Sequence, residues 1–236
     1  MSMTTILAEV RTGRIAPLGA SGVSSGIDKH LRIGPVELGP VGLSGDEQAD
    51  LKVHGGPDKA ILHYPVSHYE SWQQEFPEAA DRFVPGGFGE NFVTRDRWTE
   101  HDICLGDVMA IGPVRVQVTQ GRQPCWKLGV RFGVKEVALR VQQSFRTGWY
   151  YRVLQQGFVQ AGDELSIVDR PHPAWTVHRL MHLMFVDRLN YEALAQVAVL
   201  PELSAMWKNI LNKRIEARTV EDWKLRLHPA AVPPQQ

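Results

Sequence analysis

Glycine-containing breaks divide the first 170 residues of this chain into many short segments. Between these breaks lie runs rich in β-branched residues at a partial period of two, the pattern of half-buried strands. The breaks recur at residues 34–45, 55–56, 86–89, 106 and 162, and the clearest runs span 4–10, 60–64, 107–119 and 163–169. Many short strands without a regular alternation of strand and helix favour a barrel over a doubly wound sheet.

Two helices are expected to interrupt this β region, over 67–76 and 135–145. Gly112 and Pro113 indicate a hairpin turn whose second arm, 114–119, leads to a cysteine segment. The sequence therefore predicts a mainly β, barrel-like domain with a few helices over residues 1–170.

The apolar pattern changes to helical spacing after about residue 172, beyond a proline-containing linker. The residues at that spacing are Val177, Leu180, Met181, Met184, Leu203, Met206, Trp207, Ile210 and Leu211. Thr219 is expected to cap a last short helix that runs through Trp223. The pattern predicts a small all-α helical bundle over residues 171–236.

Composition excludes several classes of protein. Lys and Arg total 26, as do Asp and Glu, so the chain lacks the basic excess of a phosphate-backbone binder, and no nucleic-acid partner is expected. The most apolar window near the C-terminus, 180–186, is too short to span a bilayer, so no membrane association is expected. Two cysteines and no apparent signal peptide indicate a cytoplasmic protein with a free thiol at Cys125.

The segment "QVTQGRQPCWKLG", residues 117–129, places Cys125 between two basic residues. Arg122 and Lys127 would stabilise a thiolate, the form of cysteine that attacks or binds soft metals. A loop that directly follows a strand is also a common position for binding residues. The alternative is an inert, buried cysteine, and Cys104, which lacks such flanking cations, fits that alternative.

The segment "GDEQADLKVHGGPDKAILHY", residues 45–64, gathers polar groups around two consecutive glycines. Successive glycine N–H groups can form an anion-binding nest, with positive charge from Lys52, His54 and Lys59. The spacing of a Walker A loop is absent. The alternative is a solvated turn between two strands.

Taken together, six segments resemble the MOSC domain family, and more narrowly its YiiM-like bacterial group. They occur in the family's order and cover most of residues 20–165. The segments are "SSGIDK" (24–29), "GLSGDEQADLKVHGGPDKAILHYP" (42–65), "GGFGENF" (86–92), "CLGD" (104–107), "GRQPCWKL" (121–128) and "GWYYRVLQQGFVQAGD" (148–163). The helical tail resembles the three-helix domain that commonly follows MOSC in this group.

This resemblance implies a β-barrel-like fold that binds a molybdenum–pterin cofactor, with Cys125 as a thiolate ligand to the metal. The candidate contacts to the cofactor's phosphate and pterin are first Arg122, Lys52, His54 and Lys59, and then Ser25, Gly55 and Asn91. His54 is also a candidate catalytic proton donor, with Asp46 and Glu90 as alternatives. Gly121 departs from the proline that usually precedes the arginine in this family, so a looser loop around Cys125 is expected.

The resemblance further implies reduction of N-hydroxylated compounds, such as hydroxylaminopurines and amidoximes, to amines or amidines. No flavin or iron–sulfur motif is visible, so the electrons are expected from a separate reductase. The oligomeric state stays open. Two alternatives remain: sulfur transfer through a persulfide on Cys125, and a carrier of the cofactor or of a small ligand without turnover.

Overall fold

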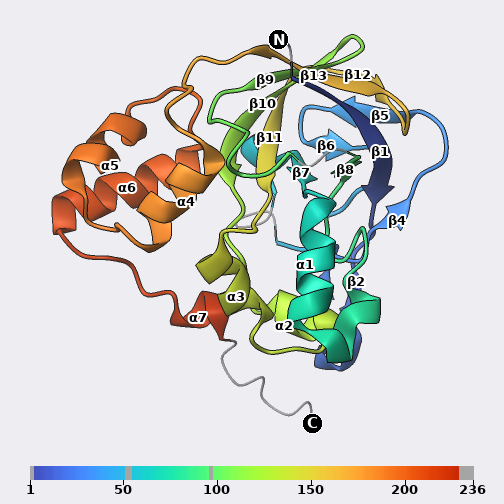
Figure 1. The fold of residues 1–236 in the computed structure, drawn as a ribbon, viewed down its shortest axis with the longest axis horizontal. Helices are drawn as coiled ribbons and strands as arrows, with labels where there is room; N and C mark the ends of the chain where they lie inside the picture. Colours follow the sequence, from blue (N-terminus) through green and yellow to red (C-terminus); the bar gives the residue numbers. More distant parts are fainter. Residues whose placement is uncertain (1–2, 51–54, 96–97, 229–236) are drawn as a thin grey trace.

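In the part of the chain that the computed structural model describes, residues 3–50, 55–95 and 98–228, seven strands close into a barrel (Figure 1). Their order around the barrel is β13 (Glu164–Asp169), β9 (Val108–Ile111), β10 (Val114–Gly121), β11 (Trp149–Gln155), β7 (Ile61–His63), β8 (Phe92–Thr94) and β1 (Thr4–Thr12). The ring closes because β1 also pairs with β13, and all neighbours are antiparallel except β7 and β8. The prediction of a mainly β, barrel-like fold is confirmed.

Shorter strands extend and cap this barrel. They are β2 (Ala16–Leu18), β3 (Val23–Ser25), β4 (His30–Leu31), β5 (Val36–Gly39), β6 (Gly42–Leu43) and β12 (Gly157–Val159). The four strand-like runs seen in the sequence correspond to β1, β7, the β9–β10 hairpin and β13. Strand β11 was not predicted, although it pairs with both β10 and β7 and so completes the barrel wall.

Strand β10 shows why the alternating pattern produces this wall. Val114, Val116 and Val118 are completely buried, whereas Arg115 and Gln117 between them are only half-buried. One face of the strand therefore fills the barrel interior, as expected from the period of two. The last residues of β10 lead directly into the segment that carries Cys125.

Three helices gather at one end of the barrel: α1 (Ser67–Glu75), α2 (Lys127–Phe132) and α3 (Val137–Ser144). The first and third match the predicted helices, whereas α2, directly after Cys125, was missed. These helices enclose an aromatic core in which the rings of Phe83 and Phe132 stack with centroids 4.2 Å apart. The ring of Phe88 packs against that of Phe132, with the two centroids 4.8 Å apart. This core therefore fixes both the glycine-rich loop around Phe88 and the helix that follows Cys125.

The C-terminal helices α4 (Val177–Phe185), α5 (Tyr191–Ala198) and α6 (Ala205–Ala217) pack beside the barrel (Figure 1). Each begins at a polar N-cap, which is Thr176, Asn190 and Ser204 respectively, and the side chain of the cap accepts a hydrogen bond from a backbone N–H in the first turn of the helix. The predicted helical bundle is confirmed. The prediction of a last short helix capped by Thr219 and running through Trp223, however, was wrong. The helix found there is α7 (Lys224–Leu227), which begins after Trp223 and is not capped by Thr219.

The apolar core continues from the barrel into the helical bundle. Leu165 of β13, Val177 of α4 and Trp175, which precedes that helix, belong to one buried cluster. The predicted boundary between residues 170 and 171 therefore separates a β region from a helical region that share one core. That it is also a domain boundary stays a proposal. Within the described residues, no helix combines the length and apolar character needed to traverse a lipid bilayer.

Gly121 has a packing role where helix α4 meets the end of β10. A Cβ atom at this position would lie 2.2 Å from Sδ of Met181 and 3.3 Å from Cγ1 of Val177. Met181 is completely buried, so it has little room to move away. The absence of a side chain at Gly121 thus lets α4 approach the strand. This close packing does not indicate the looser loop around Cys125 that was expected from the sequence.

We expect Gly121→Ala to lower the free energy of unfolding by about 1–3 kcal/mol, as overpacking does in other cores. Combining it with Met181→Ala should cost less than the sum of the two single changes, by roughly 0.5–3 kcal/mol, because the smaller side chain leaves space for the new methyl group. Urea titrations of the four proteins give this coupling energy. Gly39→Ala is the control, because its Cβ would meet no atom closer than 3.8 Å. Simple additivity would contradict the packing role.

Candidate active site

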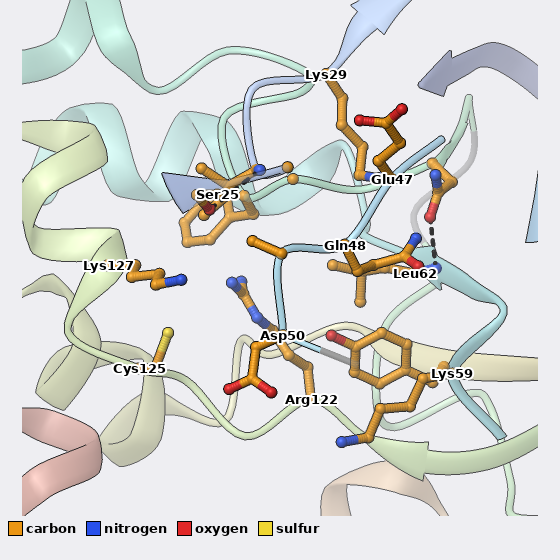
Figure 2. A pocket seen from close by; sticks show the side chains of 17 residues that line it. Ser25, Lys29, Glu47, Gln48, Asp50, Lys59, Leu62, Arg122, Cys125 and Lys127 are labelled. Carbon is orange, nitrogen blue, oxygen red and sulfur yellow. Dashed lines mark hydrogen bonds between the residues drawn. The ribbon is translucent and has the colours of Figure 1, made fainter. Parts of the chain in front are cut away.

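A pocket opens where the cysteine segment meets the loops at the end of the barrel (Figure 2). Its empty volume, including its opening to solvent, is about 610 Å³. Its walls come from the end of β3 and the loop after it, the 47–50 segment, the 3₁₀ turn before β7, the glycine-rich loop, the strands β7 and β11, and the segment that follows β10. The polar and charged side chains that line it are Ser25, Lys29, Glu47, Gln48, Asp50, Lys59, Asn91, Arg122, Cys125, Lys127 and Tyr150.

Cys125 is half-buried in this pocket, in the short connection between β10 and α2. The connection is held on both sides by Arg226 from the C-terminal helix. The backbone N–H of Trp126 donates to the Arg226 carbonyl at 2.8 Å, and the Arg226 guanidinium donates to the carbonyl of Pro124. Figure 2 shows the side chains of Cys125, Lys127 and Arg122 converging on one space. The thiol therefore lies beside two cations, on a connection whose backbone is held by Arg226.

Cys104 lies in a different environment, away from this pocket. It is only 2% exposed, and its sulfur lies 3.6 Å from the carbonyl oxygen of Pro173. Burial, reinforced by the negative charge of Asp107, raises the pKa of the Cys104 thiol to about 11. At neutral pH this cysteine is a neutral thiol, as the inert reading of its sequence suggested.

Arg122 is a buried cation with an unused donor. It is 6% exposed, its backbone N–H donates to Gly148 at 3.1 Å, and its guanidinium carbon lies 6.0 Å from the centroid of the Phe88 ring. Its atom Nη1 has no hydrogen-bond partner among the described residues. A buried, charged donor without a partner is costly unless a ligand satisfies it. Arg122 is therefore suited to hold an anionic group in this pocket.

Lys59 reaches the pocket from a 3₁₀ turn, Pro57–Lys59, that follows the glycine pair. Its Nζ lies 3.4 Å from Sδ of Met206 and 5.8 Å from the centroid of the Tyr150 ring. Burial lowers the pKa of Lys59 to about 8, with the charges of Asp58 and Asp50 opposing the shift. Its positive charge is consequently lost at a much lower pH than that of an exposed lysine.

We therefore expect anion binding to the cofactor-free protein to weaken as the pH rises from 7 to 9. A group with a pKa near 8 loses most of its charge over this interval, so the Lys59 contribution should fall up to roughly tenfold. Sulfate is a suitable probe, because its own charge is constant in this range, and titration calorimetry gives its affinity. Lys59→Arg should flatten the profile, because arginine stays protonated. An equally steep loss in that variant would contradict the role of Lys59.

Asn91 and Lys29 line the pocket from a buried polar network centred on Asp46. Asp46 pairs with Lys29, accepts from the backbone N–H of Gly13 at 2.8 Å, and accepts from Nδ2 of Asn91 at 2.9 Å. The Asn91 oxygen accepts from the Leu62 N–H at 3.0 Å. These contacts make Asn91 a support of the pocket wall. The same contacts engage both Asp46 oxygens, and Asp46 is not among the pocket-lining residues.

The remaining predicted residues have different positions. Ser25 lines the pocket, and its hydroxyl accepts from the N–H of Ile27 at 3.3 Å. Gly55 is not among the lining residues. Glu90 faces away, accepting from the Tyr69 hydroxyl and from the Gly86 N–H, and burial raises the pKa of its carboxyl. Lys52 and His54 lie outside the described residues, so their roles stay predictions.

Tyr150 and Lys29 are pocket residues that the sequence did not single out. Burial raises the pKa of the Tyr150 hydroxyl, reinforced by the negative charges of Cys125 and Asp46 and opposed by Arg122. The hydroxyl therefore stays protonated at neutral pH as a potential donor. Trp149 and Tyr151 are completely buried, so the alternation along β11 turns Tyr150 to the opposite face.

This donor set can hold an anionic ligand that also carries a soft metal. Arg122, Lys59 and Lys127 contribute positive charge, whereas the charge of Lys29 is balanced by Asp46, and a cysteine thiolate is a ligand that soft metals prefer. The unpartnered buried Nη1 of Arg122 fits a phosphate or another anionic acceptor. The residues of this pocket therefore fit a phosphorylated molybdenum–pterin group.

Comparison with known protein families identifies two consecutive regions of the chain. The family model for the MOSC domain matches residues 50–166. The family model described as the YiiM-like, 3-alpha helix domain matches residues 175–218. The first region includes Cys125 and Arg122, and the second corresponds to the helices α4 to α6.

Individual relatives extend these matches over almost the whole chain. Protein YiiM of Escherichia coli strain K12 is 38% identical over 223 residues, covering 93% of this chain and 96% of that protein. The crystal structure of Escherichia coli YiiM superimposes with a TM-score of 0.81 at 31% identity, covering 95% of this chain and 98% of that one. A protein named reductase from Gibberella moniliformis is 33% identical over 90% of this chain, which corresponds to 38% of that longer protein.

Proposed function

Because the chain belongs to the MOSC domain family, with a YiiM-like three-helix domain, we propose that it is a molybdenum-cofactor-dependent reductase of N-hydroxylated compounds. The observation that carries the proposal is the pairing, in one pocket, of Cys125 with the buried, incompletely bonded guanidinium of Arg122. The reductase name of the Gibberella moniliformis relative supports the reaction class.

Several side chains would hold the cofactor. Cys125 would supply a thiolate to molybdenum, and Arg122 and Lys59 would bind the anionic phosphate through charge-assisted hydrogen bonds. Ser25 lies at the pocket wall, where its hydroxyl can contact the pterin. Asn91 would act mainly by keeping Asp46 and strand β7 in register behind that wall. Gly55, Lys52 and His54 remain proposed contacts from the neighbouring loop.

Bound in this pocket, the cofactor would supply the two-electron chemistry that removes oxygen from an N–OH group. The net reaction is R–NH–OH + 2 e⁻ + 2 H⁺ → R–NH₂ + H₂O. The residues of the chain would orient the substrate and deliver protons. Tyr150 holds a proton on its phenol oxygen beside Cys125, and His54 is the second proposed donor. The electrons would come from a separate reductase in the cytoplasm.

The first test is to purify the protein from cells that make molybdenum cofactor and to measure bound molybdenum and pterin. Loss of 6-hydroxylaminopurine is then followed with a chemical reductant as electron source. Bound cofactor with turnover is the expected result. Bound cofactor without turnover would indicate a carrier, and a persulfide on Cys125 without molybdenum would indicate sulfur transfer.

A further inference from the structure

A second pocket adjoins the first on the side of the C-terminal helices. Its empty volume, including its opening, is about 830 Å³. Lys59, Cys125, Lys127 and Tyr150 line both pockets, so Cys125 lies at their common border. The residues that line only the second pocket are Gln120, Gln123, Trp126, Met206, Leu225 and Arg226. Barrel and helical region therefore both contribute to its walls.

The C-terminal helix α7 is attached firmly enough to serve as a wall. In Figure 1 the chain leaves α6 and returns along the molecule to α7, which lies beside α3. Arg226 donates to Oε1 of Gln142 in α3 at 2.6 Å, in addition to its two contacts with the Cys125 connection. Through Leu225 and Arg226, α7 thus forms part of the wall of the second pocket.

Gln120 lines this pocket and carries an unsatisfied, buried acceptor. The residue is completely buried, and its Nε2 donates to the carbonyl of Gly121 at 3.2 Å. Since that carbonyl can only accept, the side-chain nitrogen must face it, and the other terminal atom is Oε1. Oε1 has no hydrogen-bond partner among the described residues. A ligand that donates an N–H or O–H bond to this oxygen would remove the cost of burying it unpaired.

The other walls define the character of that ligand. Trp126, Met206 and Leu225 offer apolar surface, including a flat indole, which suits a planar ring. Lys59, Lys127 and Arg226 are basic, and none of the lining residues in the described chain is acidic. The apolar walls therefore favour a planar ligand with a donor group. The basic residues favour a neutral ligand over a cationic one.

We propose that this second pocket, lined by Gln120, Trp126, Met206 and Leu225, is the substrate chamber. In it, Oε1 of Gln120 accepts a hydrogen bond from the exocyclic N–H of a neutral heteroaromatic N-hydroxylated substrate, whose ring lies against Trp126. This inference rests on the proposed function. It adds the location of the substrate, on the opposite side of Cys125 from the cofactor pocket, and the residue that selects for an exocyclic donor.

The test compares two purines that differ only at the exocyclic nitrogen. Adenine, the product of 6-hydroxylaminopurine reduction, carries the N–H donor, and N6,N6-dimethyladenine lacks it. Gln120→Leu should weaken adenine binding, measured by equilibrium dialysis, about tenfold, the effect of one lost hydrogen bond of ordinary strength. Binding of dimethyladenine should not change. The same variant should raise KM for 6-hydroxylaminopurine while its molybdenum and pterin content stays at the wild-type level.

Gln117→Leu is the matched control, because Gln117 is on the same strand but lines neither pocket. Leu225→Trp tests the chamber independently of Gln120, since Leu225 is 72% exposed and its replacement should not disturb folding. The larger side chain should weaken binding of both purines. If Gln120→Leu does not fold, Gln120→Met, which keeps the side-chain length, replaces it.

Equal effects of Gln120→Leu on the two purines, or loss of cofactor in this variant, would overturn the assignment of Gln120. Unchanged purine binding in Leu225→Trp would overturn the chamber. Failure of the proposed function looks different: the wild-type protein would then contain no molybdenum and show no turnover. The purine comparison on that protein would still decide whether the second pocket selects for an exocyclic donor.

Discussion

Cys125→Ser should abolish reduction of 6-hydroxylaminopurine, with a loss of more than about 100-fold in turnover per bound molybdenum. This exceeds the usual 10–100-fold effect of changing an outer-shell partner of a metal site, because the ligand itself is replaced. A serine hydroxyl is a hard, weakly acidic donor that does not provide the soft anionic sulfur. Fold and thermal unfolding should be unaffected, because Cys125 is half-buried in a connection held by backbone contacts.

Cys104→Ser is the matched control for that experiment. Its hydroxyl can still donate to the nearby Pro173 carbonyl, so we expect a stability loss below about 2 kcal/mol and unchanged turnover per molybdenum. The measurement is the rate with a chemical reductant, divided by metal content. Full activity in Cys125→Ser, or equal losses in the two variants, would refute the assignment of Cys125 as the metal ligand.

Arg122→Met should separate cofactor binding from folding. Losing a charge-assisted hydrogen bond of about 1.5–3 kcal/mol weakens cofactor affinity by roughly 10- to 150-fold, so the purified variant should contain little molybdenum or pterin. The cofactor-free variant should be as stable as the cofactor-free wild type, or more stable, because an apolar side chain of similar length replaces a buried donor that lacks a partner.

Arg115→Met is the control for Arg122, since Arg115 lies in β10, the strand that Arg122 directly follows, and its guanidinium donates to the carbonyls of Gly112 and Val114. Its cofactor content should equal that of the wild type. Metal and pterin analysis, together with thermal unfolding of the cofactor-free proteins, provides both measurements. Normal cofactor content in Arg122→Met would remove Arg122 from the binding site. A strongly destabilised cofactor-free variant would instead give it a structural role.

Local sequence identified the parts of this site that lie close together along the chain. Arg122, Cys125 and Lys127 occupy one short segment after a strand, so their shared location follows from connectivity, and all three line the pocket. Lys29 and Tyr150 could not be found this way. They reach the pocket from distant segments, and only barrel closure brings those segments to Cys125.

Asn91 illustrates why the role of a residue is harder to predict than its position. It lines the pocket, but its amide bonds Asp46, the Leu62 N–H and the carbonyl of Arg11. Those partners come from three separate segments of the chain. Hydrogen bonds between distant segments have no signature in a local pattern.

By itself, the sequence determined the succession of short strands, the later helical spacing and the thiol flanked by cations, because each depends on residues near one another in the chain. Only the tertiary structure decided that β1 closes the barrel on β13, that Met181 occupies the space left by Gly121, and that α7 returns to the Cys125 connection. These features depend on contacts between residues far apart in sequence, and burial and steric fit select such contacts only when the whole chain has folded.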